Sequence, residues 1–212
     1  MSKGEPAGYN RADELRRGLA VLGQELPELA QERLLTYLDL LARWNRVHNL
    51  TAVRDPKAMV AYHLLDSLAG RPWLPRGPLV DLGSGAGLPG LVLAIAEPDR
   101  PVTLVDSAAK RTRFLNQVVG ALGLERVAVF QARMETWRPA EPVEVVTARA
   151  LTSMPELVEL AAPLLTSTGR LVAWKGVWPE AGAEGVAVEA VHPATVPGID
   201  GARHIVVARP GV

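Results

Sequence analysis

The 212-residue chain has the length of a single domain, with room for a short extension. It is 48% hydrophobic and 22% charged, which excludes wholesale disorder. It contains no cysteine, so disulfides, thiolate metal sites, iron–sulfur clusters and a cysteine nucleophile are excluded. Its 23 basic and 23 acidic residues give a net charge of zero, which argues against binding nucleic acid through a broad basic surface. A local basic patch stays possible.

Neither the N-terminal region nor any later segment indicates a membrane location. Residues 1–17 are polar and lack the apolar stretch of a signal peptide. No apolar run approaches the ~18 residues that a membrane helix needs. We therefore expect a soluble, cytoplasmic protein. Its 4 scattered histidines form no ligand cluster, so we expect no metal site.

The first third of the chain has the residue spacing of helices. A first helix is expected near Ala12–Leu22, and a second one follows Pro27. Leu34, Leu38 and Leu41 recur there at helical spacing among charged residues, as in a helix with one buried face.

A third helix is expected over Pro56–Ala69. Asp55 precedes it as the N-cap, and a proline at the first helical position suits a helix start. Arg71–Pro78 then contains three prolines and a glycine, which marks a boundary. We predict a helical extension over residues 1–75 and a second unit over residues 76–212.

Short apolar runs alternate with helical stretches in the second unit. The expected strands are Leu79–Leu82, Val102–Asp106, Val127–Gln131, Val143–Thr147, Arg170–Trp174, Val186–Val191 and His204–Ala208. The expected helices are Leu88–Ala96, Ala109–Leu122 and Met154–Leu165. This alternation predicts an α/β fold with a mostly parallel sheet covered on both faces. The last two strands have no helix between them, so we expect an antiparallel C-terminal hairpin at the sheet edge.

A glycine-rich turn follows the first strand of this unit. The segment Leu79–Gly90 reads as strand, turn and helix, and Gly83, Gly85 and Gly87 let the backbone bend sharply and approach a ligand. Asp106 ends the next strand about 20 residues further on, where a carboxylate accepts hydrogen bonds from ribose hydroxyls. This pattern predicts a nucleoside cofactor at the carboxyl edge of the sheet.

The loop resembles the S-adenosylmethionine loop of class I methyltransferases more than a dinucleotide-binding loop. The dinucleotide pattern is G-x-G-x-x-G, whereas this loop is G-x-G-x-G and follows Asp81 within the strand. The loop has no lysine followed by serine or threonine, so a Walker phosphate loop is excluded. A carboxylate buried in a strand needs partners, and we expect Asp81 to accept hydrogen bonds from loop amides.

Several separated motifs resemble those of the small-subunit ribosomal RNA methyltransferase G family, also called glucose-inhibited division protein B. The matching segments are Trp44-Asn45, Asn49 to Ala52, His63 to Leu68, Asp81 to Gly90, Leu104 to Ser107, Lys110-Arg111, Phe114-Leu115, Ala132 to Glu135, Arg149-Ala150, Trp174 to Gly176 and Arg203-His204. They span roughly residues 35–208. One departure is Met134, where the family often has alanine.

The resemblance implies a Rossmann-like class I methyltransferase fold and S-adenosylmethionine-dependent N7-methylation of one guanine in 16S ribosomal RNA near the decoding region. It places cofactor contacts at the first loop glycine, at the residue closing the loop, at the pair after the third strand and at the arginine after the fourth. Together with the loop itself, the predicted cofactor-binding residues are Asp81, Gly83, Gly85, Gly87, Leu88, Asp106, Ser107, Met134, Glu135 and Arg149.

The implied reaction needs little chemistry from the protein. Guanine N7 has an exposed lone pair and no proton at neutral pH, so an in-line attack on a sulfonium methyl group needs no general base. The enzyme must hold the two reacting atoms about 3 Å apart and aligned. Guanine O6 lies beside N7 and accepts from an arginine, so Arg149 is our candidate for a positioning role.

Other polar residues have both an RNA-binding and a structural interpretation. The candidates for RNA contact are Asn45, Asn49, Lys110, Arg111, Lys175, Arg203 and His204. The two asparagines also suit a capped helix end. Lys110 and Arg111 also suit an ordinary solvated helix face. Lys175, Arg203 and His204 also suit structural ion pairs. For His63 and Asp66, which share a helix face, we favour structural hydrogen bonding between the helical region and the sheet.

The neutral net charge favours a substrate presented on a folded particle. We expect 16S rRNA to be recognised within the 30S subunit or an assembly intermediate. Three other functions stay open from the residues: a small-molecule methyltransferase, a non-catalytic protein that senses the cofactor, and a nicotinamide-dependent oxidoreductase. The order of substrate binding and the oligomeric state are not encoded in any motif of the chain.

Overall fold

The computed structural model describes residues 10–210 as seven strands and a set of helices around one sheet. The α-helices are α1 Arg11–Val21, α2 Glu28–His48, α3 Pro56–Met59, α4 Asp66–Ala69, α5 Gly90–Ala96, α6 Ala109–Leu122 and α7 Met154–Ala161. Three further helical segments are the π-helix η1 Val60–Leu65 and the 3₁₀-helices η2 Arg71–Trp73 and η3 Ala162–Leu164. The strands are β1 Leu79–Leu82, β2 Val102–Asp106, β3 Val127–Gln131, β4 Val143–Arg149, β5 Leu165–Lys175, β6 Val188–Pro193 and β7 His204–Ala208.

The sheet has the order β3-β2-β1-β4-β5-β7-β6. Strands β1 to β5 pair in parallel with one another, and β7 pairs antiparallel with both β5 and β6. The expected α/β fold with an antiparallel C-terminal hairpin is confirmed. The chain proceeds outward from β1 to β3 on one side and from β4 to β5 on the other. Ligands of such sheets bind beyond the carboxyl ends of the strands at this switch point.

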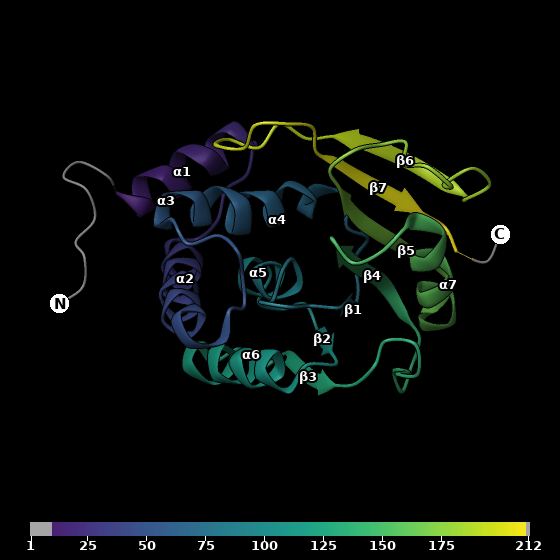
Figure 1. The fold of residues 1–212 in the computed structure, drawn as a ribbon, viewed down its shortest axis with the longest axis horizontal. Coiled ribbons are helices and arrows are strands. Elements are labelled where there is room, and N and C mark those ends of the chain that lie inside the picture. The colour runs from purple at the N-terminus through teal and green to yellow at the C-terminus, as the bar shows by residue number, and fades with distance from the viewer. Residues whose placement is uncertain (1–9, 211–212) are drawn as a thin grey trace.

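The two faces of the sheet are covered differently (Figure 1). On one face α5 and α6 pack on the strands, and α2 lies across both of these helices. The buried leucines predicted on α2 belong to the same apolar core as this face of the sheet. On the other face α7 packs against β5 and builds a second, smaller core. The helical region therefore shares a core with the sheet. The domain boundary at residue 75 stays a prediction. Residues 1–9 of the predicted extension lie outside the described part.

A local sequence signal accounts for the start of α3, whereas the ends of two other helical segments differ from the expected ones. The Asp55 carboxylate accepts a hydrogen bond from the Lys57 amide, so the predicted N-cap is confirmed. The helix that follows it is interrupted: η1 has the wider π-helical turn between α3 and α4. Helix α7 ends at Ala161, four residues before the predicted end, because η3 tightens the chain before β5.

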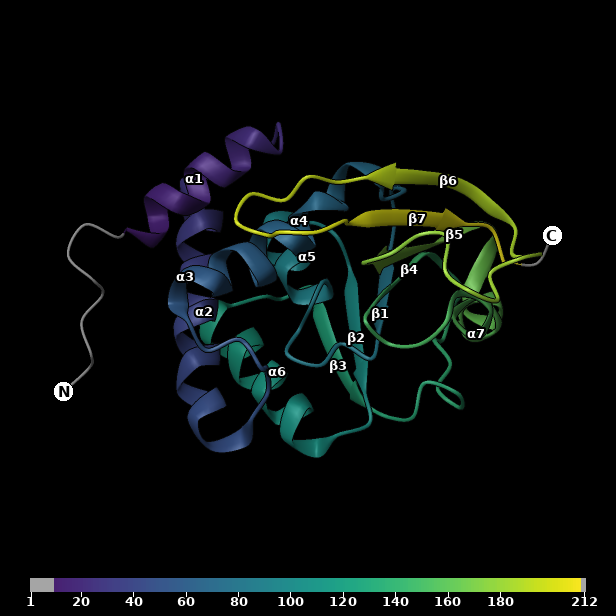
Figure 2. The ribbon, with the colours of Figure 1, turned by 45° about the horizontal axis from the view of Figure 1, so that its top comes forward.

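The loop between β6 and β7 reaches back across the molecule to the helical region, as the two views show (Figures 1 and 2). A Cβ placed on Gly198 of this loop would lie 3.0 Å from the Cβ of Ala61 in η1. The C-terminal hairpin, the π-helix and the ends of β4 and β5 thus meet on one side of the switch point.

Candidate functional site

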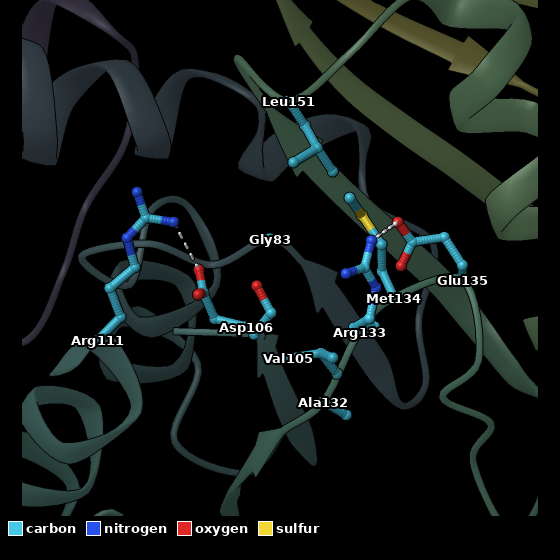
Figure 3. A pocket seen from close by; sticks show the side chains of 10 residues that line it. Gly83, Val105, Asp106, Arg111, Ala132, Arg133, Met134, Glu135 and Leu151 are labelled. Atoms are coloured by element: carbon cyan, nitrogen blue, oxygen red, sulfur yellow. Dashed lines mark hydrogen bonds and ion pairs between the residues drawn. The ribbon is translucent and has the colours of Figure 1, made fainter. Parts of the chain in front are cut away.

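A pocket of about 230 Å³ lies beyond the carboxyl ends of β1, β2 and β3. Figure 3 shows its side chains, with Gly83 behind the opening, Asp106 and Arg111 on one side, and Met134 and Glu135 on the other. The lining residues are Gly83, Val105, Asp106, Ser107, Arg111, Ala132, Arg133, Met134, Glu135 and Leu151. Five of the ten predicted cofactor residues therefore line one pocket. We call it the first pocket.

The glycine loop forms the back of the first pocket through conformations that favour glycine. Gly83, Gly85 and Gly87 have φ values of +64°, +57° and +95°. A Cβ on Gly83 would come within 2.5 Å of Leu151 Cδ1, so a side chain there would press on the opposite wall. Gly85, Gly87 and the loop-closing Leu88 shape the turn but do not line the pocket.

Asp106 fixes the loop to the end of β2. Its carboxylate accepts hydrogen bonds from the amides of Gly85 at 2.9 Å and Ala108 at 2.8 Å, and from Arg111 at 3.2 Å. A carboxylate offers about four lone-pair sites, so the three protein donors leave one. Arg111 is partly exposed, so a ligand hydroxyl that displaced it would gain a second site on the carboxylate.

Asp81 lies beside the loop, outside the first pocket. Its carboxylate accepts from the Gly90 amide at 3.1 Å and from the Thr147 hydroxyl at 2.8 Å, and it is fully buried. Burial raises the pKa of Asp81 to about 6, against the opposing effect of these hydrogen bonds. The expected bond to a loop amide is present. The geometry gives Asp81 a role in tying β1 to α5 and β4.

Glu135 and Met134 follow β3 as predicted and form the rim of the pocket. Arg133 Nη2 lies 3.5 Å from Glu135 Oε1, and both side chains are largely exposed. Such a pair contributes little to stability. The Glu135 carboxylate is therefore available to a ligand at the rim.

A second pocket of about 420 Å³ adjoins the first one. It is lined by Thr51, Val53, Tyr62, His63, Asp66, Arg149, Ala150, Trp174, Lys175, Gly176 and Arg203. Arg149 and Ala150 line the second pocket, and the next residue, Leu151, lines the first. The chain turns between them at Ala150, which has a φ of +49° although it is not glycine. Such strain is typical of functional sites.

Asp66 connects the parts of the chain that build the second pocket. Its carboxylate accepts from Arg149 at 2.7 Å and from Arg203 at 3.2 Å, and its carbonyl oxygen accepts from Trp174 Nε1 at 2.8 Å. The structural interpretation of Asp66 is confirmed, because these bonds join the helical region to β4 and β5. His63 bonds instead to the Thr51 hydroxyl, at 3.1 Å.

His63 is neutral at physiological pH. Burial and the nearby Arg149 cation lower its pKa to about 4. The Nδ1 atom of His63 is buried, with no hydrogen-bond partner among the described residues. The charged groups of the second pocket are thus the cations of Arg149, Lys175 and Arg203 and the Asp66 carboxylate, which is already hydrogen-bonded.

The predicted RNA-contact residues lie in several places. Arg203 and Lys175 line the second pocket, where Lys175 donates to the Thr152 carbonyl oxygen and pairs with Glu180. Arg111 lies in the first pocket instead. The remaining residues line neither pocket: Asn45 is buried and accepts from the Thr51 amide, Asn49 accepts from Arg54, Lys110 donates to the His48 carbonyl oxygen, and His204 Nδ1 is buried.

Two site features were missed from the sequence. Leu151 forms a wall of the first pocket, and its position two residues after the fourth-strand arginine was the available signal. The meeting of Asp66 with Arg203, 137 residues apart, left no local pattern. Within residues 10–210 no group of three potential ligands could hold a metal ion, and no helix there is long and apolar enough to cross a membrane.

Comparisons with known proteins give a consistent family. The family model described as rRNA small subunit methyltransferase G matches residues 30–206. A ribosomal RNA small subunit methyltransferase G from Marinobacter nauticus is 44% identical and covers 92% of this chain and 92% of its own length. One from Chromobacterium violaceum is 47% identical and covers 91% and 95%.

Solved structures resemble this chain in fold. A predicted O-methyltransferase from Agrobacterium tumefaciens is 22% identical with a TM-score of 0.52, covering 70% of this chain and 80% of its own. Coclaurine N-methyltransferase bound to N-methylheliamine and SAH is 15% identical with a TM-score of 0.50, covering 91% and 56%. At this identity the likeness shows the fold of the sheet and its covering helices.

Proposed function

The chain belongs to the rRNA small subunit methyltransferase G family and is an S-adenosylmethionine-dependent guanine-N7 methyltransferase of small-subunit rRNA; we propose that its two adjoining pockets divide this reaction between cofactor and acceptor base. The observation behind the proposal is that Arg149 and Ala150 line the second pocket and the next residue, Leu151, lines the first. A methyl donor in the first pocket would therefore face a base in the second.

The first pocket suits a nucleoside cofactor. Bound S-adenosylmethionine supplies an electrophilic methyl group on a sulfonium. Asp106 retains a free lone-pair site for a ribose hydroxyl, and Glu135 and Met134 offer one polar and one apolar contact for an adenine ring. The pocket is smaller than a typical whole ligand site of ~300–1,000 Å³, so part of the ligand would extend along the glycine loop toward the second pocket.

The second pocket suits a base that needs positioning and no proton removal. Asp66 is held by two arginines, and His63 is neutral with its Nε2 bonded to Thr51. These groups are engaged in the protein, which fits an acceptor atom that has no proton to lose. Arg149 has donors left for guanine O6, and their use would leave N7 free to attack the methyl carbon.

The cofactor residues then have distinct roles. We assign ligand contact to Gly83, Asp106, Ser107, Met134 and Glu135. We assign the shape of the loop to Asp81, Gly85, Gly87 and Leu88, and contact with the acceptor base to Arg149. Among the RNA candidates, Arg203 and Lys175 would lie nearest to the acceptor nucleotide.

We place the reaction on the assembled or partly assembled 30S subunit in the cytoplasm. The neutral net charge of the chain supports this, because a protein without a broad basic surface gains affinity from a preformed site. The test is methyl transfer from labelled S-adenosylmethionine to unmethylated 30S subunits and to deproteinised 16S rRNA at equal concentration. We expect faster transfer to the subunits, and equal rates would contradict recognition of the particle. Cofactor binding without transfer to either substrate would favour a sensing or small-molecule function.

A further inference from the structure

Asp66 is a carboxylate between two guanidinium groups at the floor of the second pocket. It receives Nη1 of Arg149 on one oxygen and Nε of Arg203 on the other. The Asp66 side chain is 9% exposed, whereas those of Arg149 and Arg203 are 18% and 24% exposed. The acid is thus enclosed, and both cations reach the pocket.

Each guanidinium group is held by two hydrogen bonds and keeps an Nη2 group that donates to no protein atom among the described residues. Nη1 of Arg149 also donates to the Tyr62 carbonyl oxygen at 2.8 Å, and Nη1 of Arg203 to the Ala202 carbonyl oxygen at 2.9 Å. Within residues 10–210, neither Nη2 makes a hydrogen bond in the structure. Both are donors that a guanine O6 or a phosphate oxygen would accept.

The three residues come from three distant parts of the chain. Asp66 begins α4, Arg149 ends β4, and Arg203 precedes β7 at the end of the loop that crosses to the helical region (Figure 2). Two like charges side by side repel, so without the acid between them these side chains would move apart. The pair keeps its place because Asp66 neutralises one of the two charges.

We propose that Asp66 is a positioning residue, which holds Arg149 and Arg203 as a paired donor site for the acceptor nucleotide. This inference rests on the proposed function and extends it. The ligand of the paired site is the acceptor guanosine, through its O6 or its adjacent phosphate. Asp66 itself does not touch the reacting atoms.

The direct test is Asp66→Asn, which keeps the shape of the side chain and removes its charge. We expect kcat/KM for 30S subunits to fall about tenfold or more, because the paired donors lose their alignment. We expect the Kd of S-adenosylmethionine to stay within about twofold, since Asp66 lines the second pocket only. Equal losses in cofactor affinity and in transfer would overturn the proposal.

Glu97 offers a matched control. Its carboxylate also lies between two arginines, with Arg71 at 3.0 Å and Arg100 at 2.5 Å, and it lines neither of the two pockets. Glu97→Gln removes a comparable bridge and should lower the Tm without changing kcat/KM for the subunit. A loss of transfer as large as that of Asp66→Asn would show a general effect of stability and overturn the proposal.

A double-mutant cycle separates positioning from independent contacts. If Asp66 acts through Arg203, the variant with both Asp66→Asn and Arg203→Gln should transfer no more slowly than the poorer single variant. If the losses of kcat/KM in the two single variants multiply in the double variant, Asp66 does not act through Arg203, and its positioning role is overturned. Failure of the unsubstituted protein to methylate any subunit would overturn the proposed function as well.

Arg203→Gln keeps the proposal testable if Asp66→Asn does not fold. It should show the same selective loss of transfer with unchanged cofactor affinity. An unchanged kcat/KM in this variant would overturn the proposal.

Discussion

The buried imidazole of His63 predicts a loss of stability in mild acid. Its folded pKa is about 4, against 6.5 for an ordinary histidine, because burial and Arg149 oppose the charged form. In the unfolded chain this side chain takes up a proton below pH ~6.5, and in the folded chain only near pH 4. The unfolded state therefore binds more protons between these values. The stabilising contribution is complete above pH ~6.5 and is lost as the pH falls toward 4.

The size of this effect follows from the shift. A difference of about 2.5 pKa units corresponds to about 3 kcal/mol over the whole window, at 1.36 kcal/mol per unit. Because Asp81 has the opposite pH dependence over the same range, the effect of His63 is read from the difference between the wild type and a His63 variant, by denaturant unfolding at about pH 7 and about pH 4.5. His63→Gln removes the titrating group, so its free energy of unfolding should fall about 2–3 kcal/mol less between the two conditions than that of the wild type.

His192→Gln is the matched control, because it removes an imidazole that stacks on Trp73 at the far edge of the sheet. Its loss between the two pH values should equal that of the wild type. Parallel profiles for the wild type and His63→Gln would refute the assignment of a buried neutral imidazole.

Three further substitutions test the first pocket and its support. Gly83→Ala should weaken S-adenosylmethionine binding about tenfold by calorimetry, because the added Cβ would displace Leu151. Gly123→Ala is the control: Gly123 has a similar positive φ, no atom lies within 4 Å of a Cβ placed there, and cofactor binding should be unchanged. Asp106→Asn should raise the cofactor Kd about ten- to a hundredfold by removing a charged acceptor, and an unchanged Kd would place the ligand elsewhere. Asp81, with its pKa raised to about 6, contributes stability below pH ~4 that is lost as the pH rises to about 6. Asp81→Asn should therefore destabilise more at about pH 4 than at about pH 7, and a constant difference in unfolding free energy would contradict this.

The alternation of strands and helices was readable because it depends on local patterns. β2, α6, β3 and β7 have the predicted bounds, since each begins and ends where apolar periodicity changes. The π-helix η1 was not predicted, because its apolar residues fit the helical spacing expected over Pro56–Ala69 equally well. β4 and β5 extend beyond their predicted ends, since Arg149 still pairs with Trp174 and Val143 already pairs with Leu165.

The residues that follow strand ends could be predicted from the sequence, whereas contacts between distant segments could not. The residues of the first pocket follow strand ends, so Asp106 and Glu135 could be placed by counting strands. The side-chain direction of Asp81 was not encoded in the motif, because it depends on Thr147 from a strand 66 residues away. The role of Asp66 depends likewise on Arg203, which the crossing loop brings to it.

The most direct test of the central claim is to map the methylated atom. Small subunits from a strain that lacks this gene would be incubated with the protein and methyl-labelled S-adenosylmethionine, and the rRNA would then be cleaved by borohydride and aniline. A single new cleavage, accompanied by stoichiometric label, is the predicted result because it reports an N7-methylated guanine. Label without cleavage would contradict N7 as the acceptor, and no label at all would contradict the assignment of the two pockets to cofactor and base.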